Sequence, residues 1–256
     1  MLAALVALPV EARPEENLAR MITEANAAAD AGAPLVVFPE ASLTGLVNTN
    51  DPRHDHPLGV AIPGEATDAL GEVARRRGLH VAVGLIEREA DRLYDAAVLL
   101  GPAGDILLHY RRVHPGWHGR NADPAIYCEG DRIARVETEL GAFAFLVCGD
   151  LFDDAVVERV RRLRVDWVLV PMWRCFTGSV GGAERWEREE AGTYAARVAL
   201  VGTPVLLVNA FAAPDLLGGA FGGAWAYDRD GCVRSELPAG RAGMLLADLS
   251  TLVRPR

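Results

Sequence analysis

The sequence contains no lysine, and all 26 of its basic residues are arginines. Its four cysteines lie far apart without a Cys-x-x-Cys pair, and its histidines do not recur at metal-ligand spacing, which argues against a disulfide framework or a structural zinc site. No apolar run approaches the ~20 residues of a membrane-spanning helix, and the apolar N-terminus lacks the basic segment of a secretory signal. We therefore expect a protein of the reducing cytoplasm with no membrane partner.

Acidic residues outnumber basic ones, which gives a formal net charge of -9 at pH 7. Such a charge does not attract nucleic-acid phosphates, so we expect no nucleic-acid partner and favour a small-molecule substrate. A chain of 256 residues can bury a sizeable core without a disulfide or a metal. No linker, repeat or low-complexity tract divides the sequence, which indicates a single domain over residues 1–256.

Apolar runs of strand length alternate with helical patterns along the chain. The helices are expected from Pro14 to Gly32, Glu65 to Gly78, Asp154 to Leu163 and Ala183 to Ala199. The single strands are expected within residues 1–10, 35–38, 79–86, 133–136, 142–147, 167–170 and 205–209, and hairpins are expected to join 93–100 to 106–111 and 223–233 to 243–249. This order predicts an α/β fold, a four-layer α-β-β-α sandwich with mixed sheets.

Two predicted strands end in side chains that suit covalent catalysis. The apolar run 142–147 stops at Cys148, and the run 35–38 is followed by Pro39 and Glu40. Open α/β sheets place their chemistry at the carboxyl ends of strands, where a thiol beside a base and a cation can be a nucleophile. The alternative is that Cys148 is a small buried hydrophobic residue and that Glu40 caps a helix or forms an ion pair.

Several short motifs, taken in their order, resemble the nitrilase superfamily of carbon–nitrogen hydrolases over essentially the whole chain. Residues 35–40 read LVVFPE, similar to the motif of the first family glutamate. Residues 146–150 read LVCGD, similar to the nucleophile motif, with Gly149 in place of the common tyrosine. The later part of the family pattern is matched by Trp186, Ala196, Arg197, Asn209, Gly222, Gly223, Ala224, Asp230 and Gly231.

The resemblance implies that Cys148 attacks the substrate carbon, that Glu40 acts as general base and then acid, and that water releases a thioester acyl-enzyme. The family supplies its cation as the lysine of a Tyr-x-Lys-x-His motif; residues 110–114 read YRRVH, which puts Arg112 there. Arginine can stabilise an oxyanion by charge and paired hydrogen bonds, but it does not readily donate a proton. The resemblance also implies a homodimer or higher homo-oligomer, and no metal or organic cofactor.

Further residues are candidates for the same site. Many family members carry a second glutamate where Asp123 falls, and we hypothesise that this shorter carboxylate compensates for the longer cation at Arg112. A loop aspartate more often caps a turn. We expect Trp117, Gly149 and Trp173, with the loop at 48–63, to shape the substrate pocket.

Readings from different functional classes remain open. The chain can be an amidase-like hydrolase of a small amide, carbamoyl compound or nitrile. It can also be a catalytically silent relative that serves as a ligand-binding or interface module. A third possibility is acyl transfer to a nucleophile other than water, with Arg112 gripping a substrate carboxylate. Retention of Glu40 and Cys148 favours hydrolysis, whereas loss of the lysine favours the silent relative.

Overall fold

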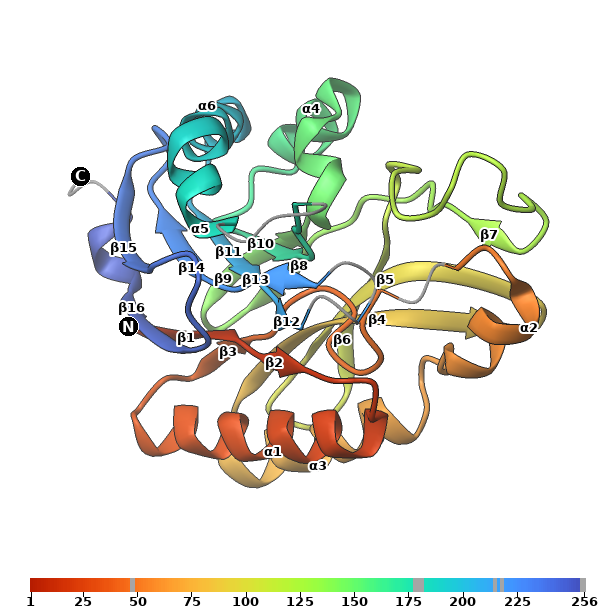
Figure 1. Ribbon diagram of the computed structural model, residues 1–256. Coiled ribbons are helices and arrows are strands. Elements are labelled where there is room, and N and C mark those ends of the chain that lie inside the picture. Colours follow the sequence, from red (N-terminus) through yellow and green to blue (C-terminus); the bar gives the residue numbers. More distant parts are fainter. Residues whose placement is uncertain (47–48, 177–181, 214–215, 217–218, 254–256) are drawn as a thin grey trace.

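Two β-sheets lie face to face, with helices on the outer face of each, in the computed structural model of the chain (Figure 1). The structure describes residues 1–46, 49–176, 182–213, 216 and 219–253. Helices α1 (Pro14–Asp30) and α3 (Glu65–Arg77) cover one sheet, and α4 (Asp154–Leu163) and α6 (Ala191–Val201) cover the other. The predicted four-layer α-β-β-α sandwich is thereby confirmed.

The first sheet has the strand order β16-β1-β3-β4-β5-β6, and β7 pairs with β5. Its strands are β1 (Leu2–Ala7), β3 (Leu35–Val37), β4 (His80–Glu89), β5 (Arg92–Leu100), β6 (Ile106–Arg111), β7 (Tyr127–Cys128) and β16 (Gly243–Asp248). The central strands β1, β3 and β4 are parallel, so their carboxyl ends share one edge, where Glu40 follows β3.

The second sheet has the order β15-β14-β11-β10-β9-β8, with β9, β10 and β11 parallel. Its strands are β8 (Val136–Thr138), β9 (Gly141–Phe145), β10 (Trp167–Met172), β11 (Val205–Asn209), β14 (Ala224–Tyr227) and β15 (Val233–Leu237). A small third sheet joins β2 (Pro9–Val10), β12 (Phe211–Ala212) and β13 (Ala220–Phe221). Cys148 follows β9, so both candidate residues leave parallel strands at their carboxyl ends.

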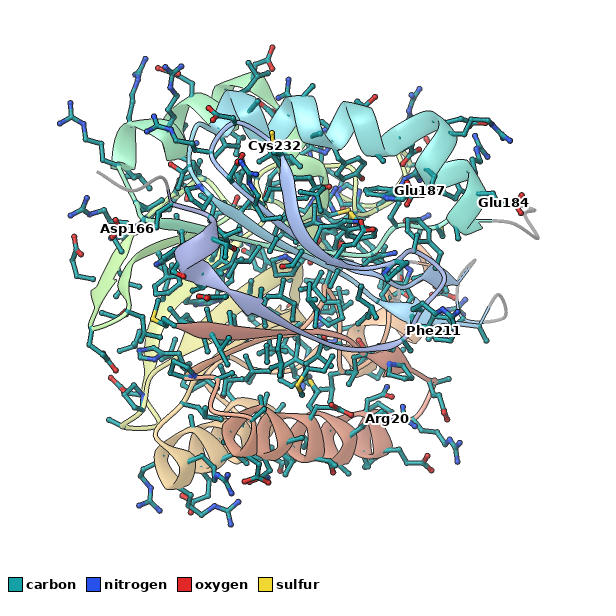
Figure 2. The ribbon with its side chains drawn as sticks, turned by 90° about the vertical axis from the view of Figure 1, so that its left-hand side faces the viewer. Arg20, Asp166, Glu184, Glu187, Phe211 and Cys232 are labelled. Carbon is teal, nitrogen blue, oxygen red and sulfur yellow. The ribbon has the colours of Figure 1, made fainter. Side chains whose placement is uncertain are left out.

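Alternation of side chains along the strands divides the core into three layers. On β1, Ala3 and Leu5 face the space between the sheets, whereas Ala4 and Val6 pack in the layer that holds Met21 of α1. A third layer lies between the second sheet and its own helices. Figure 2 shows side chains filling the space between the sheets, with charged residues such as Arg20 and Glu184 on the outside.

The last predicted hairpin is wrong in its pairing. β15 pairs with β14, but β16 crosses to the first sheet and runs antiparallel to β1, from Leu2 opposite Asp248 to Ala7 opposite Gly243. Neighbouring strands in sequence are most often paired, which is why the pattern indicated a hairpin. In the folded chain β16 covers the edge of β1, whose backbone N–H and C=O groups would otherwise lack partners.

Other segments also differ in detail from the prediction, and the strand expected at 133–136 is found as β8, at Val136–Thr138. The helix expected from Ala183 to Ala199 is divided into α5 (Gly182–Arg185), a π-helical turn η3 (Trp186–Glu190) and α6. The loop expected at 48–63 contains α2 (Pro52–Asp55) and the 3₁₀ turn η1 (His56–Leu58), while residue 48 lies outside the described residues. A last 3₁₀ turn is η4 (Leu249–Thr251). Every helix in the described ranges is too short or too polar to cross a bilayer.

Candidate active site

Glu40 is placed by a tight turn after β3. Phe38 continues the pairing of β3 with β4, and the turn then packs directly against Gly84 of β4. Gly84 N donates to Pro39 O (3.1 Å), and Ser42 N donates to Gly84 O (2.9 Å). A Cβ atom at Gly84 would lie 2.5 Å from the Glu40 Cα, so this approach requires a glycine. The Glu40 side chain is fully buried.

Cys148 opens the 3₁₀ turn η2 (Cys148–Phe152) after β9. Its φ is +46°, in the left-handed region that non-glycine residues seldom adopt and that is found disproportionately at functional sites. The Sγ atom lies 3.9 Å from Trp173 O at the end of the neighbouring strand β10. The strained turn therefore brings the thiol toward the edge shared by β9 and β10.

Asp150 ties the Cys148 turn to the segment that carries Arg112. Its carboxylate accepts hydrogen bonds from Tyr110 Oη (2.7 Å), Val113 N (3.1 Å), His114 N (2.8 Å) and Val147 N (2.9 Å). Tyr110 is on β6 of the first sheet and Val147 follows β9 of the second. This buried carboxylate thus fixes the nucleophile and the cation relative to each other across the sandwich.

Arg112 is 3 % exposed and lies between two buried carboxyl groups. Its Nη1 atom donates to Glu40 Oε1 (3.0 Å) and to Asp95 Oδ2 (3.1 Å). Its backbone N also donates to Asp95 O (2.8 Å), because it extends the pairing of β6 with β5 by one residue. Burial opposes the charge on Arg112, but the neighbouring Cys148, Glu40 and Asp95 act in the opposite direction and raise its pKa, so the guanidinium stays charged.

The remaining amino group of Arg112 is available to a substrate. Nη2 donates no hydrogen bond within the described residues, and it lies beside Gly149, next to the nucleophile. A Cβ atom at Gly149 would be 2.4 Å from Nη2 and 2.8 Å from His114 Nδ1. The glycine at this position therefore makes room for the guanidinium, and the Nη2 hydrogens can reach an oxyanion that forms next to Cys148.

Glu40 has the environment of a general base. Its second oxygen, Oε2, accepts a hydrogen bond from Trp173 N (2.6 Å). Burial, and after it the neighbouring Cys148, raise the pKa of Glu40 to about 8, although Arg112 acts in the opposite direction. A base acts best when its pKa lies near the working pH, and this shift moves Glu40 into that range.

A cavity of about 560 Å³ opens over these groups. Its lining combines the nucleophile and the cation with aromatic side chains and an ion pair; it consists of Arg112, His114, Gly116, Cys148, Gly149, Phe152, Trp173, Arg174, Glu190, Thr193 and Tyr194. The paired charges are Arg174 and Glu190, joined by two hydrogen bonds, with Glu190 in the π-helical turn η3. π-Helical turns are frequent at functional sites.

Four of the residues predicted from the sequence meet at this cavity, namely Arg112, Cys148, Gly149 and Trp173, and Glu40 lies directly behind them. Trp117 does not line it, because its ring is buried in the core of the first sheet against Tyr127. Among the residues that line the cavity none comes from the described part of the 48–63 loop.

Asp123 also lies outside the site. It is exposed, and its carboxylate accepts a hydrogen bond from Ala125 N (2.9 Å), as a turn-capping aspartate does. Besides Glu40, the carboxyl group that the structure places against Arg112 is that of Asp95, which the sequence analysis did not identify. Counting outward from the 101–105 turn of the predicted hairpin puts Asp95 opposite Arg111, and a register shift between Leu99 and Leu100 moves its partner by one residue to Arg112, so the sequence held only an approximate signal.

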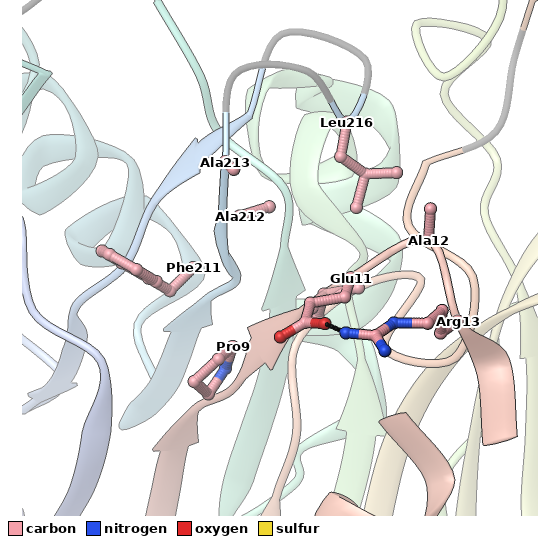
Figure 3. A pocket seen from close by; sticks show the side chains of 9 residues that line it. Pro9, Glu11, Ala12, Arg13, Phe211, Ala212, Ala213 and Leu216 are labelled. Carbon is pink, nitrogen blue, oxygen red and sulfur yellow. Dashed lines mark hydrogen bonds and ion pairs between the residues drawn. The ribbon is translucent and has the colours of Figure 1, made fainter. Parts of the chain in front are cut away.

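A second cavity, of about 430 Å³, has a different set of lining residues (Figure 3). It is bordered by the segment from Pro9 to Arg13 and by Phe211 on β12. Its charged groups, Glu11 and Arg13, pair with each other at 2.6 Å. Its lining includes no cysteine, so we assign the candidate active site to the cavity at Cys148. Within the described residues no group of three or more His, Cys, Asp or Glu side chains could hold a metal ion.

The fold and the site together define a class of protein: an α-β-β-α sandwich with a thiol, a buried carboxyl and a buried cation at the carboxyl ends of its parallel strands. The carbon-nitrogen hydrolase family model matches residues 2–255. The chain therefore belongs to the carbon–nitrogen hydrolase family, which confirms the resemblance found in its motifs.

Individual relatives agree with this assignment. An omega-amidase of Mus musculus is 33% identical over 112 residues, which are 43% of this chain and 39% of that protein. A nitrilase of Pyrococcus abyssi is 35% identical over 102 residues, 40% of this chain and 38% of that protein. The matched segments thus span about two fifths of these curated relatives.

Solved structures share the fold over almost the whole chain. A carbon-nitrogen hydrolase from Helicobacter pylori has a TM-score of 0.83 at 18% identity, over 98% of this chain and 90% of that one. An amidase from Nesterenkonia sp. has a TM-score of 0.76 at 22% identity, over 97% and 89%.

Proposed function

We propose that the chain is an amidase-like carbon–nitrogen hydrolase that cleaves a non-peptide C–N bond of a small amide, carbamoyl compound or nitrile. The observation that carries the proposal is the hydrogen bond from Arg112 Nη1 to Glu40 Oε1 (3.0 Å) behind a cavity lined by Cys148 and Arg112. The base, the cation and the thiol that this chemistry needs come from separate strands and meet at one place.

In the acylation half-reaction with an amide, the Cys148 sulfur attacks the carbonyl carbon while its proton passes to Glu40. The carbonyl π electrons move to the oxygen, and the Nη2 hydrogens of Arg112 stabilise the oxyanion. When the oxyanion collapses, the C–N bond breaks, and Glu40 gives its proton to the leaving amine. A thioester to Cys148 remains.

In the second half-reaction, Glu40 takes a proton from water as the water oxygen attacks the thioester carbon. The second oxyanion collapses with cleavage of the C–S bond, and the proton on Glu40 returns to the sulfur. No step takes a proton from the cation. An arginine can therefore occupy the lysine position, provided that its charge and its N–H groups are correctly placed.

The cavity favours a small substrate. Its aromatic walls, Phe152, Trp173 and Tyr194, suit an apolar or planar group, and its volume of about 560 Å³ suits a ligand of modest size. The names of the relatives include an omega-amidase and a nitrilase, which supports an amide or a nitrile among the three substrate types.

The alternative is a catalytically silent relative, which the absence of lysine suggested. The environment of Glu40 argues against a silent relative. A buried carboxyl group with a pKa raised to about 8 costs stability, which a protein that does not use the group has no reason to keep. Acyl transfer uses the same acyl-enzyme and differs only in the nucleophile of the second half-reaction.

Mass spectrometry of the intact protein with a panel of small amides, carbamoyl compounds and nitriles tests the proposal. We expect turnover or a covalent mass increase that Cys148→Ala abolishes and that Cys128→Ala, at a half-buried cysteine outside the cavity, leaves in place. Alkylation by chloroacetamide tests the thiol without the need to know the substrate. If Cys148 is alkylated no faster than Cys128 in the folded protein, the thiol is not activated and the silent relative is favoured.

A further inference from the structure

Glu40, Asp95 and Arg112 form a buried cluster with one cation and two carboxyl groups. Each of the three residues is at most 3 % exposed. If both carboxyl groups were ionised, the cluster would carry a net charge of about -1 out of contact with water, and an uncompensated buried charge costs several kcal/mol. A single proton on either carboxyl group removes that charge.

The hydrogen bonds of the cluster also require a proton. The Asp95 and Glu40 side chains meet at the same donor, Arg112 Nη1, yet two ionised carboxylates are acceptors only and have no hydrogen to share. Asp95 Oδ1 is buried, and it accepts no hydrogen bond from any described residue. A proton on Asp95 turns this unsatisfied acceptor into a donor.

The partners of each group indicate which carboxyl carries the proton. Glu40 accepts from two donors among the described residues, Arg112 Nη1 at 3.0 Å and Trp173 N at 2.6 Å. Within the same described ranges, the side chain of Asp95 accepts only from Arg112 Nη1, at 3.1 Å. More donors favour the ionised form, so the negative charge belongs on Glu40. In agreement, burial and then the charge of Glu40 raise the pKa of Asp95 well above its usual range.

We propose that Asp95 is a neutral carboxylic acid that donates its proton to Glu40 and thereby positions the ionised Glu40 carboxylate as the general base. The proposal rests on the proposed function for the role of Glu40 as a base, but the protonation of Asp95 can be tested without it. Asp95 acts through Glu40 and Arg112, so it is a positioning residue.

Other ionisable groups near the cluster leave this charge balance in place. Cys148 faces it from η2, and Asp150 and Tyr110 face Arg112 from η2 and β6. Asp150 is satisfied by three backbone N–H groups and the Tyr110 hydroxyl. Burial and Asp150 raise the pKa of Tyr110, which keeps that hydroxyl neutral.

Infrared spectroscopy tests the protonation directly. At about pH 9, one unit above the pKa of Glu40, we expect the native protein to show the C=O stretch of a protonated carboxyl group and Asp95→Asn to lack it. Asp55→Asn is the matched control, since Asp55 is equally buried but its pKa is lowered by hydrogen bonds such as that from Tyr127, so it should leave the band unchanged. Absence of the band from the native protein, or its persistence in Asp95→Asn, would overturn the proposal.

The pH dependence of Cys148 alkylation tests the positioning role. Asp95→Asn replaces a neutral donor by a neutral donor, so we expect the pH at which the alkylation rate rises to stay within about half a unit of the native value, and Asp95→Ala, which removes the donor, to move it upward. An ionised Asp95 would predict a fall of about one unit or more in Asp95→Asn, because a negative neighbour of Glu40 is removed. That result would contradict the proposal.

The two measurements separate the two proposals. If Cys148 is not activated in the native protein, the hydrolase function fails, yet the infrared band still decides whether Asp95 is protonated. If Cys148 is activated but the band is missing or the rate profile moves downward in Asp95→Asn, the hydrolase function stands and the proposal for Asp95 fails.

Discussion

Gly149 is the residue whose replacement tests most directly how an arginine fits into this site. A Cβ atom at this position would lie 2.4 Å from Arg112 Nη2 and 3.3 Å from its Cζ, whereas ordinary contact begins near 3.4 Å. The backbone of Gly149 does not require a glycine, because its φ lies outside the left-handed region. Gly149→Ala therefore crowds the guanidinium, and also His114 Nδ1 at 2.8 Å, without straining the backbone of the turn.

The size of the effect follows from the distances. The guanidinium must move by about 1 Å, the difference between 3.4 and 2.4 Å, and its Nη1 is held by Glu40 and Asp95. A misplacement of about 1 Å in a catalytic site can reduce the rate ~100-fold, and removing an oxyanion donor has an effect of similar or larger size. We expect kcat/KM to fall about 100-fold, together with a loss of stability of roughly 1–3 kcal/mol from overpacking.

A double-mutant cycle with Arg112→Lys separates this mechanism from general damage. Lysine has no Nη2 atom, so Arg112→Lys removes the closest contact of the added methyl group and leaves the one with His114 Nδ1 at 2.8 Å. We expect Gly149→Ala to reduce kcat/KM far less in the Arg112→Lys protein than in the native one. The assay is release of ammonia from the best amide of the panel. Gly192→Ala is the control, because a Cβ atom at Gly192 meets nothing within 4 Å.

The reasoning is refuted if Gly149→Ala retains native kcat/KM, since Arg112 would then not depend on the space that the glycine leaves. It is equally refuted if the methyl group reduces activity by the same factor with arginine and with lysine at position 112. The first result would direct attention to another oxyanion donor, and the second to a role of Gly149 in the η2 turn itself.

Further predictions concern the strained, buried and exposed groups around the site. Cys148→Gly should be more stable to urea than Cys148→Ala by about 1 kcal/mol, because only glycine adopts a φ of +46° without strain. Equal stabilities of the two variants would show that the backbone at position 148 is not strained. The pKa of Glu40 is raised from 4.5 to about 8, so between these pH values the folded state binds more protons than the unfolded state and loses stability as pH rises. The stability advantage of Glu40→Gln over the native protein in urea unfolding should therefore grow from pH 5 to pH 8, by roughly 1–3 kcal/mol. An advantage that does not grow with pH would contradict the raised pKa. Tyr110→Phe removes the hydroxyl that donates to Asp150 at 2.7 Å and should cost about 1–2 kcal/mol in the same assay, whereas no loss would mean that the backbone donors suffice. Asp123→Asn should leave kcat/KM within about twofold because Asp123 is exposed and caps a turn, and a large fall would return it to the site.

Much of the fold was determined by local patterns in the sequence. Helix α4 and strand β11 have the predicted bounds, and α1 starts at the predicted Pro14, because caps, prolines and apolar runs act within a few residues. The same locality explains the wrong hairpin: no nearby residue tells β16 to leave β15 and pair with β1. That choice depends on an edge formed more than two hundred residues earlier in the chain.

The candidate site divides in the same way. The motifs were sufficient to identify Glu40, Arg112 and Cys148, since each stands at the end of a recognisable strand. The family register placed Asp123 in the site as well, and Trp117 was expected to shape its pocket, because position in the sequence does not determine which way a loop folds. The structure puts one in the core and the other on the surface.

The sequence by itself determined the family, the layers of the fold and the three groups that would carry the chemistry. Only the tertiary structure decided how an arginine is accommodated, because its environment is assembled from strands far apart in the chain: Asp95 pairs with it from β5, and Gly149 leaves it room from η2. Burial of two carboxyl groups beside one guanidinium, and the pKa of Glu40 that results, are properties of that assembly and of no single segment.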